Sequence, residues 1–141
     1  MTVYADTSFL VSLYVPDRHS AEAQRRLLAH PLVWFTPLHR AEWTHAICQH
    51  VFQRKMSAAE AQWVLRNMED DLAQGLWVQA DLPEAAFESC VGLARQHCAR
   101  LGVRTLDSLH VASALEFKAE RFWTFDERQA KLAQLAGLKT S

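Results

Sequence analysis

Short apolar runs alternate along this chain with longer stretches in which apolar residues recur at helical spacing. The short runs are rich in valine and aromatic residues, which is typical of strands buried in a sheet, and they lie at 3–5, 32–35, 76–80 and 121–125. The longer stretches predict helices at 9–15, 21–30, 37–55, 57–75, 81–102, 106–115 and 127–136. Strands that alternate with helices predict an α/β fold. Its mostly parallel central sheet would have four or five strands, the fifth at 138–140, and helices on both faces.

Capping signals mark the helix boundaries without indicating a second domain. Thr36 and Pro37 are a cap and a first-turn proline for the helix at 37–55, and a capping box at 57–60 precedes the next helix. The chain has 141 residues and no repeat or linker, so we expect a single domain that spans 1–141. The faces buried in that domain are expected to carry Trp43, Ile47, Val51, Trp63, Val64, Met68, Phe87, Val91, Leu93 and Ala94.

Half of the residues are apolar, yet the apolar stretch near the N-terminus, 9–15, is too short to cross a membrane. No basic segment or cleavage site precedes it, so we expect a soluble, cytoplasmic protein that does not bind membranes. The net charge of −1 argues against a strongly basic surface that coats nucleic acid. A local basic groove stays open, because the 15 lysine and arginine residues can cluster.

Cysteine and histidine residues show none of the spacings of a structural metal site. Three cysteines, Cys48, Cys90 and Cys98, include no CxxC pair and are expected to be reduced and buried. The three histidines of the helix at 37–55 are not spaced to bind one ion from one helical face. We therefore expect the seven histidines to lie on the surface or to cap helices rather than to bind zinc.

Four acidic residues are distinguished by their positions in the predicted elements. Asp6 and Asp126 follow apolar strands, whereas Glu42 and Asp107 occur among apolar or small residues on helices. A structural interpretation is available, because Asp6 can cap the next helix and Glu42 can extend from a helix rim into water. A functional interpretation is that the carboxyl ends of parallel strands meet at one edge of the sheet, where ligands bind. All four carboxylates can then converge on one site.

Converging carboxylates repel one another, and this repulsion raises their pKa values unless a cation lies between them. Ligand sets made only of oxygen favour magnesium or manganese over zinc or copper. Such an ion activates water and stabilises the charge that develops on a phosphoryl group during transfer. The pattern therefore indicates a Mg²⁺ or Mn²⁺ site formed by Asp6, Glu42, Asp107 and Asp126.

The segments around these acids resemble the PIN-domain family, and within it the toxin subunits of VapC-type toxin–antitoxin pairs. The resemblance rests on YADTSFLVSLY at the start of the chain, TPLHRAEWTHAI around Glu42, RTLDSLHVASAL around Asp107 and FWTFDERQAKLAQLAGLKT around Asp126. These segments occur in the order that the family shows, and together they extend over essentially the whole chain.

The resemblance implies a PIN fold and a metal-dependent endoribonuclease, which hydrolyses RNA phosphodiester bonds with a water activated by Mg²⁺ or Mn²⁺. The four acids would be its catalytic residues and metal ligands. Hydroxyls that would position water or the substrate phosphate belong to Thr7, Ser8 and Thr124. Glu127 directly follows Asp126, so either acid can face the metal. Basic side chains that contact phosphates, or that are merely solvated, would be Arg104, Arg128 and Lys131.

The resemblance also implies a homodimer and a cognate antitoxin protein. The helical hairpin at 37–75 is the expected partner-binding element, because its large apolar side chains exceed what a lone hairpin can bury. These side chains are Trp43, Phe52 and Trp63. The alternative is that they complete the core of the monomer.

Three other classes of protein fit these residues less well. An Asp followed by Thr after the first strand also occurs in haloacid-dehalogenase phosphatases, but these need a second acid where Ser8 stands. A receiver domain needs an acidic pair after the first strand and a late lysine, and neither is evident. A catalytically inert PIN-like module that acts only through assembly with a partner does not require four mutually repelling acids.

Overall fold

The computed structural model describes residues 1–141 and contains a four-stranded sheet in which all strands are parallel. Strand β1 lies at the centre, with Val3 opposite Val33 of one neighbour and Arg121 of the other. The strands, in sheet order, are β3 (Val78–Gln79), β2 (Leu32–Phe35), β1 (Thr2–Ala5) and β4 (Arg121–Trp123). Segments that follow β1 and β4 therefore leave the sheet at the same edge.

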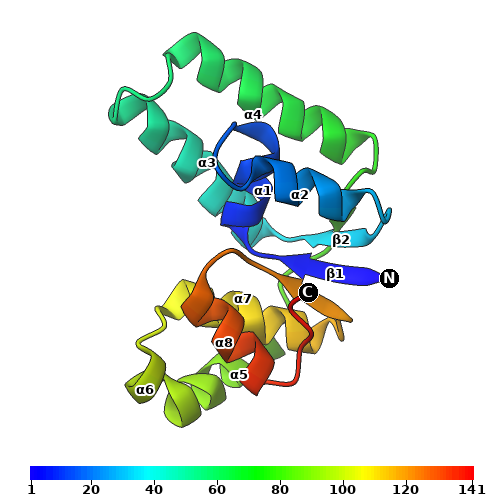
Figure 1. Cartoon of the computed structure of the whole chain (residues 1–141), viewed down its shortest axis with the longest axis vertical. Coiled ribbons are helices and arrows are strands. Elements are labelled where there is room, and N and C mark those ends of the chain that lie inside the picture. Colours follow the sequence, from blue (N-terminus) through cyan, green and yellow to red (C-terminus); the bar gives the residue numbers. More distant parts are fainter.

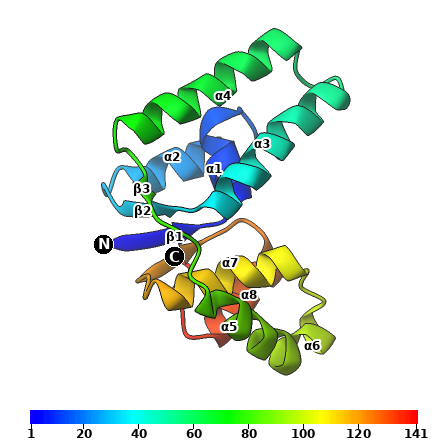
Figure 2. The ribbon, with the colours of Figure 1, turned by 180° about the vertical axis from the view of Figure 1, so that it is seen from behind.

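Helices cover both faces of the sheet, so the predicted α/β class is confirmed (Figures 1 and 2). The helices on one face are α1 (Thr7–Tyr14), α2 (Ser20–Leu27), α3 (Pro37–Phe52) and α4 (Ala58–Ala73). Those on the other face are α5 (Ala85–Leu93), α6 (Ala99–Leu101), α7 (Thr105–Glu116) and α8 (Glu127–Leu135). A π-helical turn, Ala94–Cys98, joins α5 to α6.

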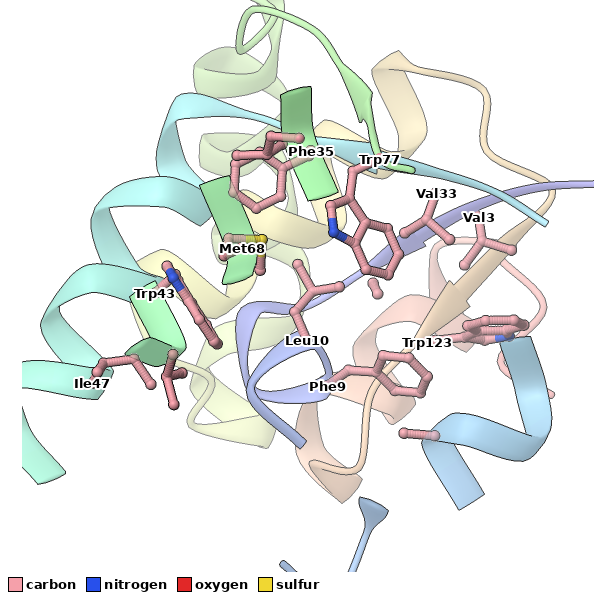
Figure 3. Packing of buried hydrophobic residues seen from close by; sticks show 14 of the residues in the cluster. Val3, Phe9, Leu10, Val33, Phe35, Trp43, Ile47, Met68, Trp77 and Trp123 are labelled. Atoms are coloured by element: carbon pink, nitrogen blue, oxygen red, sulfur yellow. The ribbon is translucent and has the colours of Figure 1, made fainter. Parts of the chain in front are cut away.

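The sheet separates two hydrophobic cores. Alternation along β1 places Val3 and Ala5 in the core under α1 to α4, whereas Tyr4 belongs to the core under α5, α7 and α8. In the first core, shown in Figure 3, Phe9 of α1 packs on Trp123 of β4 with ring centroids 5.3 Å apart. Side chains of β1 pack into both cores, and this packing fixes the position of the end of the strand.

Most predicted boundaries are confirmed within a few residues, and the differences have local causes. The α3 helix starts at Pro37 after its Thr36 cap, but it ends at Phe52 because Arg54 adopts a left-handed φ of 57°. Strand β4 ends at Trp123 because β1, its neighbour, ends beside it at Ala5. The predicted edge strand at 138–140 is reduced to a single bridge between Lys139 and Arg121.

Several side chains that were predicted to be buried are exposed instead. Trp63 is 63% exposed, because the buried stripe of α4 runs along its neighbouring face through Ala61, Val64, Met68 and Leu72. Phe87 and Val91 are exposed because α5 turns Ala86, Cys90 and Leu93 toward the core. Trp43, by contrast, is 2% exposed and belongs to the core of the domain.

The predictions for cysteines and histidines also need correction. All three cysteines are free thiols, but Cys48 is exposed and Cys98 is half-buried, so only Cys90 is buried as predicted. His110 is buried within α7, neither at the surface nor at a cap, whereas His39 does cap α3 but is also fully buried; both form hydrogen bonds near the end of β1. No helix of this fold has the length and apolar character needed to cross a bilayer.

Candidate active site

A cavity of about 560 Å³ opens where β1 and β4 end, between α1, α3 and α7. Residues from the first turn of α1 and of α7, and from the second turn of α3 onward, line this cavity. The polar side chains that form its acidic end are Asp6, Thr7, Ser8, Glu42, Asp107, His110 and Asp126. The structure thus brings all four acids singled out in the sequence to one cavity, together with two of the three hydroxyl residues.

Asp6 is at once a helix cap and a lining residue of the cavity. One carboxylate oxygen, Oδ1, accepts the Phe9 N–H at 2.8 Å and so caps α1. The other, Oδ2, accepts hydrogen bonds from the hydroxyls of Ser8 and Thr124, each at 2.9 Å. Burial raises the pKa of Asp6, and these hydrogen bonds oppose that shift. No lysine or arginine forms a salt bridge with this carboxylate.

Thr124 connects three of the acidic positions although it does not itself line the cavity. Its Oγ1 lies 2.9 Å from Asp6 Oδ2 and 2.8 Å from Gln129 Oε1, and it accepts the Asp126 N–H at 3.0 Å. Gln129 is 1% exposed, and its amide nitrogen donates to the Asp107 carbonyl oxygen at 3.1 Å. Because these groups are buried and paired, the network fixes the spacing between the backbones that carry Asp6, Asp107 and Asp126.

Glu42 is held from two sides through one carboxylate oxygen. Its Oε1 accepts a hydrogen bond from Thr7 Oγ1 at 2.8 Å and forms a short contact with His110 Nε2. His110 Nδ1 pairs with the Tyr4 hydroxyl at 2.9 Å. Burial raises the pKa of Glu42, but the hydrogen bonds from His110 and Thr7 outweigh it, so the net pKa is lowered. The carboxylate is therefore ionised, and its Oε2 is left for other partners.

His39 fixes the start of α3 beside Asp6. Its Nδ1 accepts the Thr36 N–H at 3.0 Å, which makes Nε2 the protonated nitrogen that donates to the Ala5 carbonyl at 2.8 Å. Burial, with the nearby His110, lowers the pKa of His39 to about 3, so this ring is neutral. The imidazole thereby connects the residue before Asp6 to the first turn of the helix that carries Glu42.

Asp107 is half-buried and Asp126 is exposed. Asp107 Oδ2 accepts a hydrogen bond from Arg104 Nε at 3.2 Å, and the Arg104 side chain is 84% exposed. Asp126 is the cap of α8, where its Oδ1 accepts the Gln129 N–H at 2.8 Å. Glu127 lines a neighbouring cavity with Arg128 rather than the main one. Of the two adjacent acids, it is therefore Asp126 that lines the main cavity.

No three acidic, histidine or cysteine side chains gather closely enough in this structure to enclose a metal ion. The donor chemistry nevertheless fits a hard divalent cation, because the four acids supply only oxygen. Mg²⁺ commonly keeps several of its waters and takes one or two carboxylates, so an open set of acids around a cavity can hold it. The Asp6 carboxylate is buried and lacks a basic partner, so a bound cation would offset the free-energy cost of burying its charge.

A family model described as PIN domain matches residues 3–135. The chain belongs to the PIN-domain family. This confirms the resemblance found in the sequence. No curated protein is similar enough in sequence to this PIN domain to be counted as a relative.

Solved structures resemble this PIN domain over nearly their whole length. VapC20 of Mycobacterium tuberculosis, a toxin that cleaves the sarcin–ricin loop, is 17% identical with a TM-score of 0.69, and the match covers 99% of this chain and 98% of that one. FitAcB of Neisseria gonorrhoeae is 13% identical with a TM-score of 0.74, covering 99% and 96%. VapBC2 of Rickettsia felis, bound to a promoter DNA fragment, is 14% identical with a TM-score of 0.68, covering 100% and 98%. At these identities the likeness shows a shared fold.

Three side chains near the cavity were missed in the sequence: His110, Gln129 and His39. A signal existed for His110, which lies one helical turn after Asp107 and therefore on the same face of α7. Gln129 is similarly one turn after Asp126, but a glutamine in a polar helix looks like a surface residue. His39 was assigned to the surface or to a cap, and it does complete the capping box of α3 with Thr36.

Proposed function

We propose that this PIN domain is a metal-dependent endoribonuclease that hydrolyses RNA phosphodiester bonds. The observation that carries the proposal is that Asp6, Glu42, Asp107 and Asp126 all line one cavity at the carboxyl edge of the sheet. Structural reasons explain parts of this arrangement, such as the caps formed by Asp6 and Asp126, but not why Glu42 and Asp107 face the same opening. A nuclease with a divalent cation needs such a set of oxygen ligands.

Within this proposal, the four acids Asp6, Glu42, Asp107 and Asp126 hold Mg²⁺ or Mn²⁺. When bound, the ion supplies an activated water and stabilises the charge on the phosphoryl group. Glu42 is fixed through Oε1, so its Oε2 can orient the attacking water and accept its proton. The hydroxyls that position water or substrate phosphate are Thr7, Ser8 and Thr124.

Basic residues at the rim would bind the phosphates of the RNA on either side of the cleaved bond. Arg104 lines the main cavity, and it is the candidate nearest to the acids because it bonds to Asp107. Arg128 lines the adjoining cavity, whereas Lys131 is exposed on α8, one helical turn after Arg128. A guanidinium group that is 84% exposed loses little by exchanging its carboxylate partner for a phosphate oxygen.

The test compares RNA cleavage by the purified protein in Mn²⁺, in EDTA, and after Mn²⁺ is restored in excess. Cleavage that depends on Mn²⁺ and returns with it would support the proposal. Equal cleavage in EDTA would indicate a contaminating or metal-independent activity. No cleavage of a broad set of structured and single-stranded RNAs would favour the alternative, a catalytically inert module that acts through partner assembly.

We also propose that the chain is the toxin of a toxin–antitoxin pair and acts in the cytoplasm as a homodimer. Its structural neighbours include toxin–antitoxin complexes, such as one from Klebsiella pneumoniae. The hairpin at 37–75 offers Phe52 and Trp63, which are 82% and 63% exposed, as a surface for the antitoxin. Co-expression with the product of a neighbouring short gene should relieve toxicity, and Trp63→Ser should weaken that relief while leaving RNA cleavage intact.

A further inference from the structure

The cavity has a second end that the four acids do not explain. Beyond Ser8, its wall is formed by Val11 of α1 and Val15, which follows α1, both half-buried, by Ala46 and His50 on α3, and by Phe125. The apolar side chains of the cavity lie at this end, which we call the apolar end, although Ser12, Asp17 and two histidines line it as well. The total volume of about 560 Å³ lies within the range of roughly 300–1,000 Å³ that is usual for organic ligands. An ion and a phosphate group would occupy only the acidic end.

Flat aromatic rings form one side of this apolar end. Phe125 stacks on His19 with ring centroids 4.2 Å apart and planes inclined by only 5°. On the core side, Phe125 stacks on Phe9 with centroids 5.2 Å apart and planes inclined by 15°. The three nearly parallel rings rise from the buried core to the cavity, and the outermost, His19, is partly exposed.

Both rings that reach the cavity are held in place before any ligand binds. The Arg26 guanidinium lies 5.6 Å from the centroid of Phe125 and forms a 2.9 Å salt bridge with Glu22. The loop that carries His19 is fixed to α1, because Asp17 accepts the Ser12 hydroxyl at 2.8 Å and the His19 N–H at 2.7 Å. A preorganised surface binds a planar group with little loss of conformational entropy.

Asp17 adds a polar group to the rim of this end. Burial raises its pKa, but hydrogen bonds from the His19 N–H and from two serine hydroxyls outweigh it, so the net pKa is lowered. The carboxylate is ionised and acts only as an acceptor. Its Oδ2 accepts one hydrogen bond, from Ser12, and can accept another from an N–H group of a ligand.

We propose that the apolar end binds an unpaired nucleobase of the RNA, stacked on the His19–Phe125 pair, while the adjacent phosphate lies among the acids. The inference rests on the proposed nuclease function and adds a subsite for recognition of the base. Proteins that read single-stranded RNA stack its bases on aromatic side chains, including histidine, and bond to their edges. Here the His19–Phe125 ring pair, the ionised Asp17 carboxylate and the acidic end that would receive the phosphate lie in one cavity. The proposal predicts cleavage in single-stranded or looped segments rather than in duplex.

The test removes the His19 ring, the outer ring of the His19–Phe125 pair, without disturbing the fold. His19 is the N-cap residue of α2 but makes no side-chain capping bond, so His19→Ala should fold normally. His19→Phe keeps a flat ring, and His45→Ala is the matched control because His45 is exposed on α3 away from the cavity. The probe is a single-stranded RNA that carries 2-aminopurine at successive positions. Binding is measured by its fluorescence and by polarisation, with Ca²⁺ replacing Mn²⁺ to separate binding from cleavage.

With the wild type, 2-aminopurine should be quenched by stacking at one position of the strand. His19→Ala should abolish that quenching and weaken binding by about 5- to 150-fold, the scale of one base–aromatic stack. An abasic site at that position should weaken wild-type binding equally and His19→Ala binding hardly at all. His19→Phe and His45→Ala should both behave like the wild type.

Cleavage of the same RNA in Mn²⁺ separates the two proposals. Quenching that depends on His19, without any cleavage, would retain the base subsite and refute the nuclease. The opposite result is that the wild type cleaves the RNA but has the same RNA affinity and 2-aminopurine fluorescence as His19→Ala at every position. This result would retain the nuclease proposal and overturn the base subsite. An effect of His19→Ala that is equal on intact and abasic RNA would also overturn it, because a purely structural defect does not depend on the base.

Discussion

The neutral, buried His39 makes the stability of this PIN domain sensitive to mild acid. Its pKa is lowered to about 3 in the folded protein, whereas a histidine in an unfolded chain titrates near 6.5. Between these two values, the unfolded state binds one more proton than the folded state. The free energy of unfolding therefore falls as the pH is lowered through 6.5, and it continues to fall toward pH 3.

The size of the effect follows from the 1.36 kcal/mol that accompanies each pKa unit. From pH 7 to pH 5, the His39 contribution should fall by about 2 kcal/mol, since pH 5 lies about 1.5 units below the unfolded pKa. His39→Gln cannot take up this proton, so it should lack this part of the pH dependence. It will be less stable at pH 7, because it loses the pair of bonds to Thr36 and Ala5.

The assay is urea denaturation of the wild type and His39→Gln at pH 7 and pH 5, analysed for the free energy of unfolding. The stability gap between the two proteins should narrow by about 2 kcal/mol at the lower pH. His45→Gln removes an exposed histidine from the same helix, so its stability should stay parallel to that of the wild type. A gap that is equal at both pH values would refute the reasoning, because it would mean that His39 takes up its proton as readily in the folded state.

Three further predictions concern the metal, the core and the Glu42 contact. Mn²⁺ at a hundredfold excess over its Kd should stabilise the protein by about 2.7 kcal/mol, which raises the Tm by roughly 5–13 °C in calorimetry, and Asp107→Asn should lose most of this shift. In urea denaturation, Trp43→Ala should cost about 3–5 kcal/mol and Trp63→Ala at most about 0.5, because only Trp43 is buried. His110→Leu should lower kcat for RNA cleavage by about 10- to 100-fold with less effect on KM, because it releases Glu42 rather than the substrate.

The fold could be predicted because its signals are local in the sequence. Asp6, Thr36 and Ser57 cap helices in the structure as their positions before helical stretches suggested. The length of β3 was overestimated, since only Val78 and Gln79 pair, and they pair with a single neighbour at the edge of the sheet. Pairing length depends on the partner strand, and no pattern within 76–80 carries that information.

The gathering of the acids was predictable from the rule that parallel strands end at one edge, but the groups that hold them in place were not. His110 reaches Glu42 across 68 positions of the chain and Tyr4 across 106. Such long-range pairs leave no periodic signal, and a histidine inside an apolar helix has no partner visible in its own segment. Trp63 was misassigned for a related reason, because Trp63, Val64 and Leu65 are consecutive apolar residues and the pattern does not show which of them points inward.

The central claim, that the acids lining the cavity form a metal-dependent nuclease site, is tested most directly by single-turnover RNA cleavage in Mn²⁺. The comparison needs the wild type, Asp107→Asn, and Asp81→Asn as a control that changes an exposed acid outside the cavity. Asp107→Asn should cleave at least about 100-fold more slowly, the scale of losing one electrostatic contact to the transition state. Asp81→Asn should match the wild type. Equal rates for Asp107→Asn and the wild type would contradict the account.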